Sequence, residues 1–398
     1  MKTLLNLIII LWTGTVLAGT YNGGSGTEAK PYKISNVGNW QELMNTPSDW
    51  DKHFILTNNL LFLMGADLTP VGSENQPFTG VVDGQGYYLM GTKIEQPADY
   101  YVGLFGYIGS GGHIKNLGTR IPVKGKLYVG GLAGYSLGTL TNCYATGSVS
   151  GGGMYAGGLV GYKNSDSTTS FCYATGSVSS SWYVGGLIGL NGQGTIISCY
   201  ATGQVNGNSF IGGLVGYNHY SEVSSCYATG AVSGTEDKVG GLVGYDYGGA
   251  VVNSFASGAV SGGSEVGGLA GCTHGTLTHC YAVGSVKGTT DIGGLAGIKG
   301  SETYYPIIAC FWDTQTSGLT DGVGNQDPDS ASVMGKTSAQ MKSLSTFAPA
   351  EWDFINVWGI IPNQTYPYLR TDWIADLNHD KKVDLADFEI FASQWLRQ

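Results

Sequence analysis

The sequence predicts an all-β protein folded as a right-handed parallel β-solenoid, or β-helix, of about eight repeat coils with caps. A phrase first complete at residues 129–135, Val-Gly-Gly-Leu-Ala-Gly-Tyr, recurs at steps of 26 to 28 residues. A second phrase, such as residues 143–149, lies between successive copies. Both phrases are rich in β-branched and aromatic residues and bounded by glycine, and no helical apolar period separates them. Such a fixed period indicates stacked strand units, which parallel crossovers join in a right-handed sense.

The residues before the regular repeat divide into two parts. An apolar run extends from Leu4 to Trp12 and is followed by small residues up to Ala18. Because the run is too short to span a membrane, residues 1–18 are predicted to be a secretory signal peptide. Residues 19–99 are predicted to form an N-terminal cap with irregular first coils, because the open ends of stacked sheets must be blocked.

Composition excludes one class of function and agrees with export. The net charge is −10, charged residues make up 12% of the chain, and no arginine lies between Arg120 and Arg370. A nucleic-acid surface needs clustered lysine and arginine, so that function is excluded. Glycine accounts for 66 of 398 residues, against an average near ~7%. An exported, acidic, glycine-rich chain would meet polysaccharide, mineral ions or other surface proteins.

Equivalent residues of the repeats, residues 100–310, should stack into columns along the solenoid. One column consists of Cys143, Cys172, Cys199, Cys226, Ser254, Cys280 and Cys310. Side chains stacked in a parallel ladder have Cβ atoms about 4.8 Å apart, beyond the ~3.5–4.5 Å of a disulfide. The column is therefore predicted to be a ladder of buried free thiols rather than a set of disulfides or metal ligands.

If the cysteines face inward, the residue after each of them faces outward. This gives an aromatic column of Tyr144, Tyr173, Tyr200, Tyr227, Phe255 and Tyr281. A second aromatic column precedes the glycine pair and consists of Tyr100, Tyr128, Tyr155, Tyr183 and Phe210, followed by Lys238, Glu265 and Asp291. Exposed aromatic columns can dock sugar rings or a partner protein. They can also simply stabilise successive coils, which is favoured because every coil needs a stack.

The glycine-pair phrase leaves one question of direction open. Leucine occupies the same position in every copy, from Leu104 to Leu295, which is typical of a core position. The next residue is also always apolar, from Phe105 to Ala296. Strict alternation along a strand cannot bury both residues, and a bend at the glycine pair would be needed to reset it.

Groups that could carry catalysis are sparse in the repeats. Asp237, Glu265 and Asp291 come near one another by repeat position and are predicted to form a solvated turn. The set Cys272, His274, His279 and Cys280 has a zinc-like composition, but its last two members are strand neighbours that point to opposite faces. We therefore predict no catalytic residues and no enzyme.

The two phrases recurring in register resemble the GLUG-motif repeat family, which is named for Gly-Leu-x-Gly. The resemblance covers about half of the chain. It implies a bacterial cell-surface or extracellular β-solenoid, and the family as a whole implies no single reaction. Residues 311–370, where the period has stopped, are similar to segments that follow GLUG repeats and are interpreted as a C-terminal cap.

Residues 371–398 resemble the calcium loop of an EF-hand or a dockerin, followed by one helix. The predicted Ca²⁺ ligands are Asp376, Asn378, Asp380, the carbonyl oxygen of Lys382, Asp384 and Asp387. The loop departs from the pattern because Lys381 stands where glycine usually makes the turn and an aspartate replaces the last glutamate. The single copy argues against a cohesin-type partner, because dockerins that bind cohesins carry two.

Together these observations predict a secreted or cell-surface repeat protein with an adhesion, attachment or scaffolding role and no catalysis. No membrane span is expected in the exported chain, and the partners would be polysaccharide or another surface protein. The alternative is a binding module or enzyme of an extracellular polysaccharide-degrading system, suggested by the aromatic columns and the dockerin-like tail. A third interpretation is a threonine-faced binder of ice or mineral.

Overall fold

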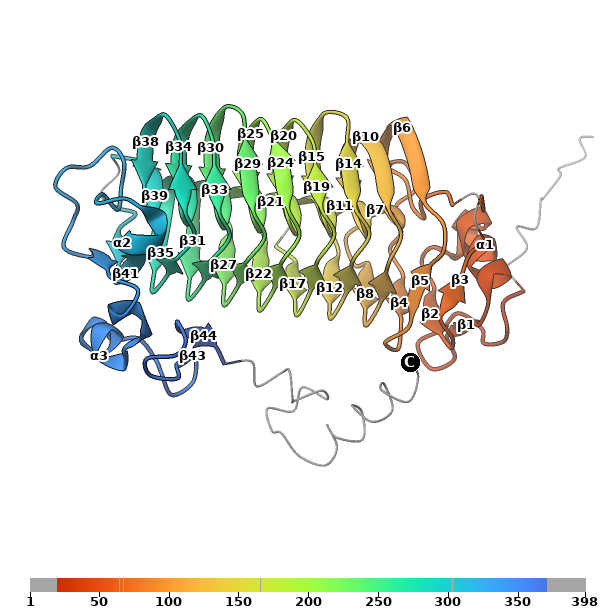
Figure 1. The fold of residues 1–398 in the computed structure, drawn as a ribbon. Helices are drawn as coiled ribbons and strands as arrows, with labels where there is room; N and C mark the ends of the chain where they lie inside the picture. Colours follow the sequence, from red (N-terminus) through yellow and green to blue (C-terminus); the bar gives the residue numbers. More distant parts are fainter. Residues whose placement is uncertain (1–19, 64, 67, 165, 302–303, 371–398) are drawn as a thin grey trace, which may run out of the picture.

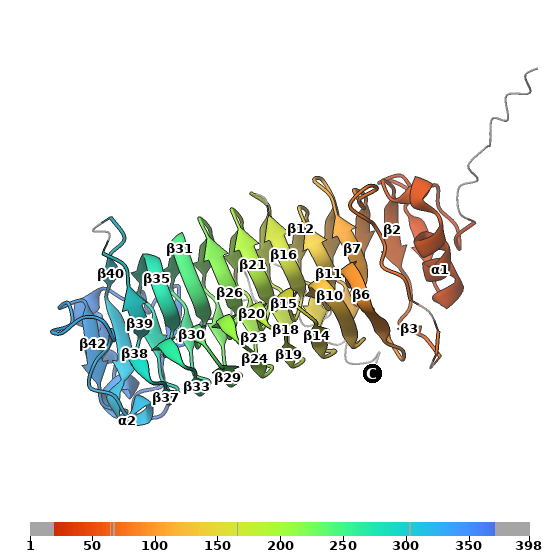
Figure 2. The same cartoon turned by 90° about the horizontal axis from the view of Figure 1, so that it is seen from above.

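The computed structural model describes residues 20–63, 65–66, 68–164, 166–301 and 304–370. In this part of the chain the backbone winds into a parallel β-solenoid of about ten turns, which confirms the predicted fold class (Figure 1). Strands of successive coils pair in register in three parallel sheets of 17, 11 and 14 strands, which we call sheets 1, 2 and 3. Viewed from above, the coils lie side by side along the whole length of the solenoid (Figure 2).

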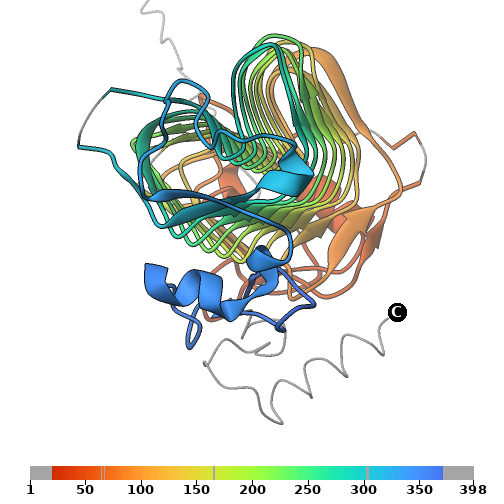
Figure 3. The ribbon, with the colours of Figure 1, turned by 60° about the vertical axis from the view of Figure 1, so that its left-hand side comes forward.

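One coil illustrates the unit. Sheet 1 receives β11 (Ala133–Ser136) and β12 (Thr139–Thr141), sheet 2 receives β13 (Tyr144–Ala145), and sheet 3 receives β14 (Val149–Gly151) and β15 (Met154–Gly157). Such short strands follow from the glycines that separate the apolar pairs. Seen along its axis, each coil has two lobes separated by an inward bend of the backbone (Figure 3).

The glycine pair makes this inward bend. A Cβ atom added at Gly158 would overlap the carbonyl oxygen of Gly186 in the next coil, so the backbones approach more closely than any side chain allows. Leu159 and Val160, on either side of the start of β16 (Val160–Asn164), are both 0% exposed. The bend thus turns two consecutive side chains into the core. Both apolar positions after the glycine pair therefore face inward, which strict alternation along a strand would not allow.

Left-handed residues recur at two places in each coil, one before the inward bend and one at the corner between sheets 1 and 2. Tyr155, just before the glycine pair, has φ of 61°, and Asn142, just before the cysteine, has φ of 52°. The equivalent positions in other coils also have positive φ, although few of them are asparagine or glycine. The repeated corner must outweigh the usual cost of about 1–2 kcal/mol for this conformation.

The first coils come from residues that do not show the repeat. Strands β1 (Tyr32–Ile34), β2 (His53–Leu56) and β4 (Val81–Asp83) pair in sequence with β8 (His113–Lys115) in sheet 1. The stack is therefore longer than the eight repeats indicate. These segments keep the strand alternation that the sheet requires while lacking the glycine-pair phrase that makes a repeat visible.

A helix closes the N-terminal end of the solenoid. Helix α1 (Val37–Asn45) begins where the side chain of Asn36 accepts a hydrogen bond from the N–H of Asn39. It buries Trp40, whose ring lies 6.1 Å from that of Phe105, and Leu43. The helix thus covers core side chains of the first coils that would otherwise face water.

The chain folds back on itself at the other end. Strand β41 (Cys310–Asp313) pairs with β42 (Val333–Lys336), after which α3 (Leu344–Phe347) and the antiparallel pair β43 (Trp358–Gly359) and β44 (Tyr368–Leu369) lie against the last coils (Figure 1). These elements enclose a second hydrophobic cluster containing Phe311, Phe347, Trp352 and Trp358. The predicted signal peptide and the predicted calcium loop both lie outside the described residues.

Candidate functional site

Two aromatic columns line the inward bend, and together we call them the tyrosine seam. The column before the glycine pair consists of Tyr101, Tyr128, Tyr155, Tyr183 and Phe210, with neighbouring ring centroids 4.7 to 5.0 Å apart. The column after it includes Tyr107, Tyr135, Tyr162, Tyr217 and Tyr245. Rings also meet across the bend, as Tyr155 and Tyr162 do at 5.3 Å. Burial raises the pKa of Tyr162 and of Tyr217 to about 12, so these phenols stay neutral over the ordinary pH range.

The first rung of the seam differs from the prediction. Tyr101, not Tyr100, stacks on Tyr128, with ring planes 8° apart. The first copy has one glycine fewer between its valine and its leucine, so counting from the glycine shifts the alignment by one residue. Tyr100 instead pairs with Leu127 and is 51% exposed.

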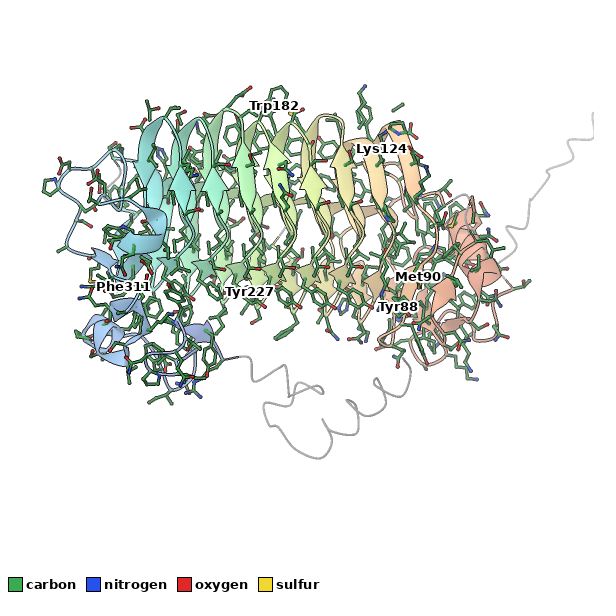
Figure 4. All side chains as sticks on the ribbon, in the orientation of Figure 1. Tyr88, Met90, Lys124, Trp182, Tyr227 and Phe311 are labelled. Atoms are coloured by element: carbon green, nitrogen blue, oxygen red, sulfur yellow. The ribbon has the colours of Figure 1, made fainter. Side chains whose placement is uncertain are left out.

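A third aromatic column, which we call the sheet 2 column, runs along sheet 2, where Figure 4 labels Tyr227. Tyr144, Tyr173, Tyr200, Tyr227, Phe255 and Tyr281 follow one another at 4.8 to 5.1 Å, with ring planes 2° to 6° apart. Tyr281 is buried beneath the C-terminal cap, where its hydroxyl donates a hydrogen bond to the carbonyl of Pro367 at 2.5 Å. The cap therefore covers one end of this column.

This stacking bears on the eight residues that the sequence offers as a sugar-binding surface: Tyr128, Tyr155, Tyr183, Phe210, Tyr144, Tyr173, Tyr200 and Tyr227. A pyranose packs its C–H groups against the negative face of an aromatic ring. In the column before the glycine pair and in the sheet 2 column, nearly parallel neighbours cover the faces of each interior ring. Only ring edges and hydroxyls are presented outward, so the geometry favours mutual stabilisation of successive coils.

The column of the seam that precedes the glycine pair ends at Phe210, and Lys238 follows it with an ionic cluster. Its ammonium lies 5.3 Å from the ring of Phe210 and 6.0 Å from that of Tyr245, within the range of cation–π attraction. It pairs with Asp237 at 2.6 Å and with Glu265 at 3.1 Å. Of the three carboxylates predicted to form a solvated turn, Asp237 and Glu265 are thus partly shielded and share one ammonium, because the left-handed backbone at Lys238 directs its side chain along the seam.

Next to Tyr245, on the side away from β30 (Asp237–Gly240) along its own strand, lie four rings that we call the aromatic patch: His219, Tyr220, Tyr247 and His274. They come from β26 (Val215–His219), the residue after it, β31 (Val243–Val252) and β35 (Ala270–Thr278). Tyr220 stands at 69° to His219 and 80° to Tyr247. Sequence reasoning missed this patch because its residues fall outside both repeated phrases, although the aromatic side chains at positions 219, 247 and 274 do follow the repeat spacing.

The cysteine column faces inward as predicted, and it satisfies the backbone at a corner. Each of its six cysteines is a buried free thiol. The N–H of Cys172 donates to the sulfur of Cys199 at 3.4 Å, and the N–H of Cys226 donates to the hydroxyl of Ser254 at 3.0 Å. Burial raises the pKa of the Cys199 thiol well above its usual range, so the S–H remains and can donate to the carbonyl of Ile197, 3.2 Å away. Cysteine and serine are equivalent here because both accept this hydrogen bond.

A column of buried polar residues lies inside sheet 1, and its sequence signal is weak because its members differ in type. Asn191 donates to Asn218 at 3.0 Å, Asn218 donates to Asp246 at 2.8 Å, and Thr273 donates to Asp246 at 3.4 Å. Burial raises the pKa of Asp246 to about 7, although the hydrogen bonds from Asn218 and Thr273 oppose this shift. Asp246 is thus a protonatable group within the core.

The remaining predicted sites stand as follows. Among the described residues, no group of three or more histidine, cysteine or acidic side chains is placed to hold a metal ion. Cys280 points into the core, while His279 lies beside Trp352 of the cap. The predicted Ca²⁺ ligands at residues 376–387 lie outside the described residues. In the part of the chain that the structure describes, no helix is both long and apolar enough to cross a membrane.

The fold and its columns define a repeat β-solenoid. The GLUG motif matches it at residues 125–150, 180–206 and 207–233, so the chain carries GLUG repeats. It is 32% identical over 146 residues to halomucin of Haloquadratum walsbyi, and 34% identical over 138 residues to a provisionally named Gly-rich membrane protein of Evansella cellulosilytica. These matches cover 34% and 32% of this chain but only 2% and 16% of those relatives.

Two solved structures are similar in fold. A candidate immunoglobulin A1 protease from Bacteroides ovatus aligns with a TM-score of 0.46 and 19% identity, over 88% of this chain and 95% of that one. A structure named IgA1 protease aligns with a TM-score of 0.42 and 13% identity, over 83% of this chain and 24% of that one.

Proposed function

We propose that this protein is an exported solenoid of the cell surface or extracellular space that serves adhesion, attachment or scaffolding and does not catalyse a reaction. The observation that carries the proposal is the repeating stack itself. At its corners, glycines allow adjacent coils to approach closely, and thiol and hydroxyl groups accept backbone hydrogen bonds from the neighbouring coil. Its aromatic rings stack on the equivalent rings of adjacent coils. About ten turns at about 4.8 Å each give a rod of roughly 45 Å.

Such a rod presents equivalent residues at equal intervals on each face. A partner with its own repeat, such as a polysaccharide or another surface protein, can engage several coils at once, which raises avidity without any strong single contact. The relative named as a membrane protein supports a surface location for this chain as well. An export signal at residues 1–18 fits the same location, and the mature chain would then begin at Gly19.

One experiment tests this function. The purified exported protein is applied to a glycan array and to intact cells of the organism that makes it, and the same glycans are assayed for release of reducing ends. Binding to glycans or cells without turnover supports attachment. Turnover of any bound glycan would overturn the non-catalytic role and favour an enzyme of a polysaccharide-degrading system.

Calcium belongs to this proposal as an ordering ion for the tail. Side-chain oxygens of Asp376, Asn378, Asp380, Asp384 and Asp387, with the carbonyl of Lys382, match the ligand spacing of an EF-hand loop. Lysine at the glycine position favours weak affinity, on the order of 10⁻⁴ M, as in extracellular modules. Calorimetric titration of the whole protein with Ca²⁺ should show one site that the double change Asp376→Ala and Asp380→Ala removes; equal heat in both proteins would contradict it.

A second candidate, a carbohydrate-binding module, is favoured by one specific observation. The aromatic patch is a group of rings that do not stack face to face throughout, beside ionised groups that can bind hydroxyls. The array separates this candidate from a purely structural scaffold, because a scaffold would bind no free glycan.

A further inference from the structure

Two coils depart from the repeat on both sides of the inward bend. On one side, the aromatic column that ends at Phe210 is continued by Lys238 and Glu265. On the other side, the seam continues through Tyr245 and is extended outward by the aromatic patch, with Tyr245 5.8 Å from His274 and 6.0 Å from Tyr247. The Lys238 ammonium, 6.0 Å from the ring of Tyr245, joins the two sides. Rings and ionised groups therefore form one continuous surface.

The rings of this surface are arranged differently from those of the columns. Tyr220 is 52% exposed and Tyr247 is 36% exposed. Their planes are nearly perpendicular, so one presents an edge to the other and neither covers both faces of its neighbour. Tyr247 also lies parallel to His219, but their ring centroids are 5.8 Å apart, wider than the 4.8 to 5.1 Å of the sheet 2 column. Aromatic faces that remain in contact with water are favourable docking surfaces for apolar C–H groups.

The charges beside the rings select among possible ligands. One ammonium, Lys238, is shared by the carboxylates of Asp237 and Glu265, so the cluster has an excess of negative charge. In a chain of net charge −10, this repels an acidic polysaccharide. Carboxylates and imidazoles can still hydrogen-bond the hydroxyls of an uncharged sugar.

We infer that the aromatic patch, together with Lys238 and Glu265, is a binding site for a neutral polysaccharide. Tyr220 and Tyr247 receive the C–H faces of pyranose rings, and His219, His274 and Glu265 bind their hydroxyls. The chain of sugars runs along the solenoid axis, because His219, Tyr247 and His274 follow one another on three successive coils. This inference rests on the proposed attachment function and names the chemistry of its ligand.

Affinity electrophoresis of the whole protein tests the site. Native gels are cast with neutral hydroxyethylcellulose, xyloglucan, galactomannan or dextran, or with acidic polygalacturonate or alginate. The wild-type protein should be retarded by at least one neutral polysaccharide and by neither acidic one. The double variant Tyr220→Ala and Tyr247→Ala should bind at least 10-fold more weakly, because it removes both ring platforms.

The matched control is Trp182→Ala. Trp182 is 40% exposed but lies on β20 (Trp182–Gly185) of sheet 3, whereas the patch strands belong to sheet 1 (Figure 4). This control should bind like the wild type, and both variants should keep the β-type circular dichroism spectrum. If the double variant does not fold, the single change Tyr220→Ser at the most exposed ring replaces it, with at least a 3-fold loss expected.

Three outcomes would overturn the site: no retardation by any neutral polysaccharide, equal retardation of the patch variant and the wild type, or equal loss in Trp182→Ala. Attachment to cells is measured in parallel. A protein that attaches to cells but binds no neutral polysaccharide contradicts the site alone. A protein that neither attaches to cells nor binds any glycan contradicts both the site and the attachment role on which it rests.

Discussion

The sheet 2 column and the aromatic patch are both aromatic, yet they offer opposite surfaces. In the column, Tyr173, Tyr200 and Tyr227 repeat in register, and their ring planes differ by only 2° to 3°. In the patch, His219 lies parallel to Tyr247 at the wider spacing of 5.8 Å, and Tyr220 stands nearly perpendicular to Tyr247. Identical rings stack face to face and leave little aromatic surface for a ligand to contact. In a solenoid of this kind, a binding surface is therefore expected where the repeat is interrupted rather than where it is regular.

The largest expected effect concerns Asp246, the one carboxyl among the four side chains described for the buried polar column. Its pKa is raised by burial to about 7 when folded, against about 3.9 when unfolded. The folded state therefore holds the proton more tightly, and stability falls as pH rises from about 4 to about 7, by up to about 4 kcal/mol. Denaturant unfolding across this range should show the slope.

Asp246→Asn is the matched variant, because its amide oxygen can still accept from Asn218 while carrying no charge. The slope assigned to Asp246 should disappear, and the variant should be more stable than the wild type at pH 8. A slope that is unchanged in Asp246→Asn would show that another group carries it.

The second effect concerns the invariant corner. A Cβ at Gly213 would overlap the carbonyl oxygen of Gly241 and approach the Cβ of Ala228. Because these are backbone and core atoms that cannot move aside, Gly213→Ala should cost about 3 kcal/mol. At Gly152, where the nearest atom to an added Cβ is 3.6 Å away, Gly152→Ala should change stability by less than about 0.5 kcal/mol. Comparable midpoints of thermal unfolding for the two variants would contradict the corner argument.

The third effect separates hydrogen bonding from packing in the cysteine column. Cys199→Ala leaves the buried N–H of Cys172 without its sulfur acceptor, which should cost about 2 kcal/mol. Cys199→Ser keeps an acceptor, as Ser254 does naturally, and should cost clearly less. If serine destabilises as much as alanine in urea unfolding, the thiols serve only to fill space.

The smallest effect compares one ring from each region directly. Tyr200→Leu removes two stacking contacts, at 4.8 and 4.9 Å, and should lower stability by about 1 kcal/mol without changing polysaccharide binding. Tyr220→Leu should change stability by less than about 0.5 kcal/mol but weaken binding. Both variants are measured by thermal unfolding and by affinity electrophoresis on the same samples. Loss of binding in Tyr200→Leu but not in Tyr220→Leu would contradict this comparison.

Much of the fold could be predicted because it is periodic. The recurrence of the glycine pair and of the cysteine position was sufficient to derive a parallel stack, an inward thiol column and an outward aromatic column. The first coils, β1, β2 and β4, could only be read as irregular because they pair by backbone hydrogen bonds without repeating the phrases. The one-residue misalignment at Tyr100 has a similar cause. The first copy lacks one glycine, and the bend accommodates this deletion, so counting back from the remaining glycine assigns the wrong tyrosine to the column.

The sequence by itself determined that this chain stacks, because a side chain recurring every 26 to 28 residues must meet its own equivalent one coil away. It could not determine which rings would hide their faces from water, since that depends on the angle between neighbours. Nothing in the sequence distinguished Asp246 from the other acidic residues, whereas the fold buries this carboxyl between Asn218 and Thr273. Periodicity decides which residues become neighbours, but only the tertiary structure decides the direction and the solvent exposure of their side chains, and binding depends on both.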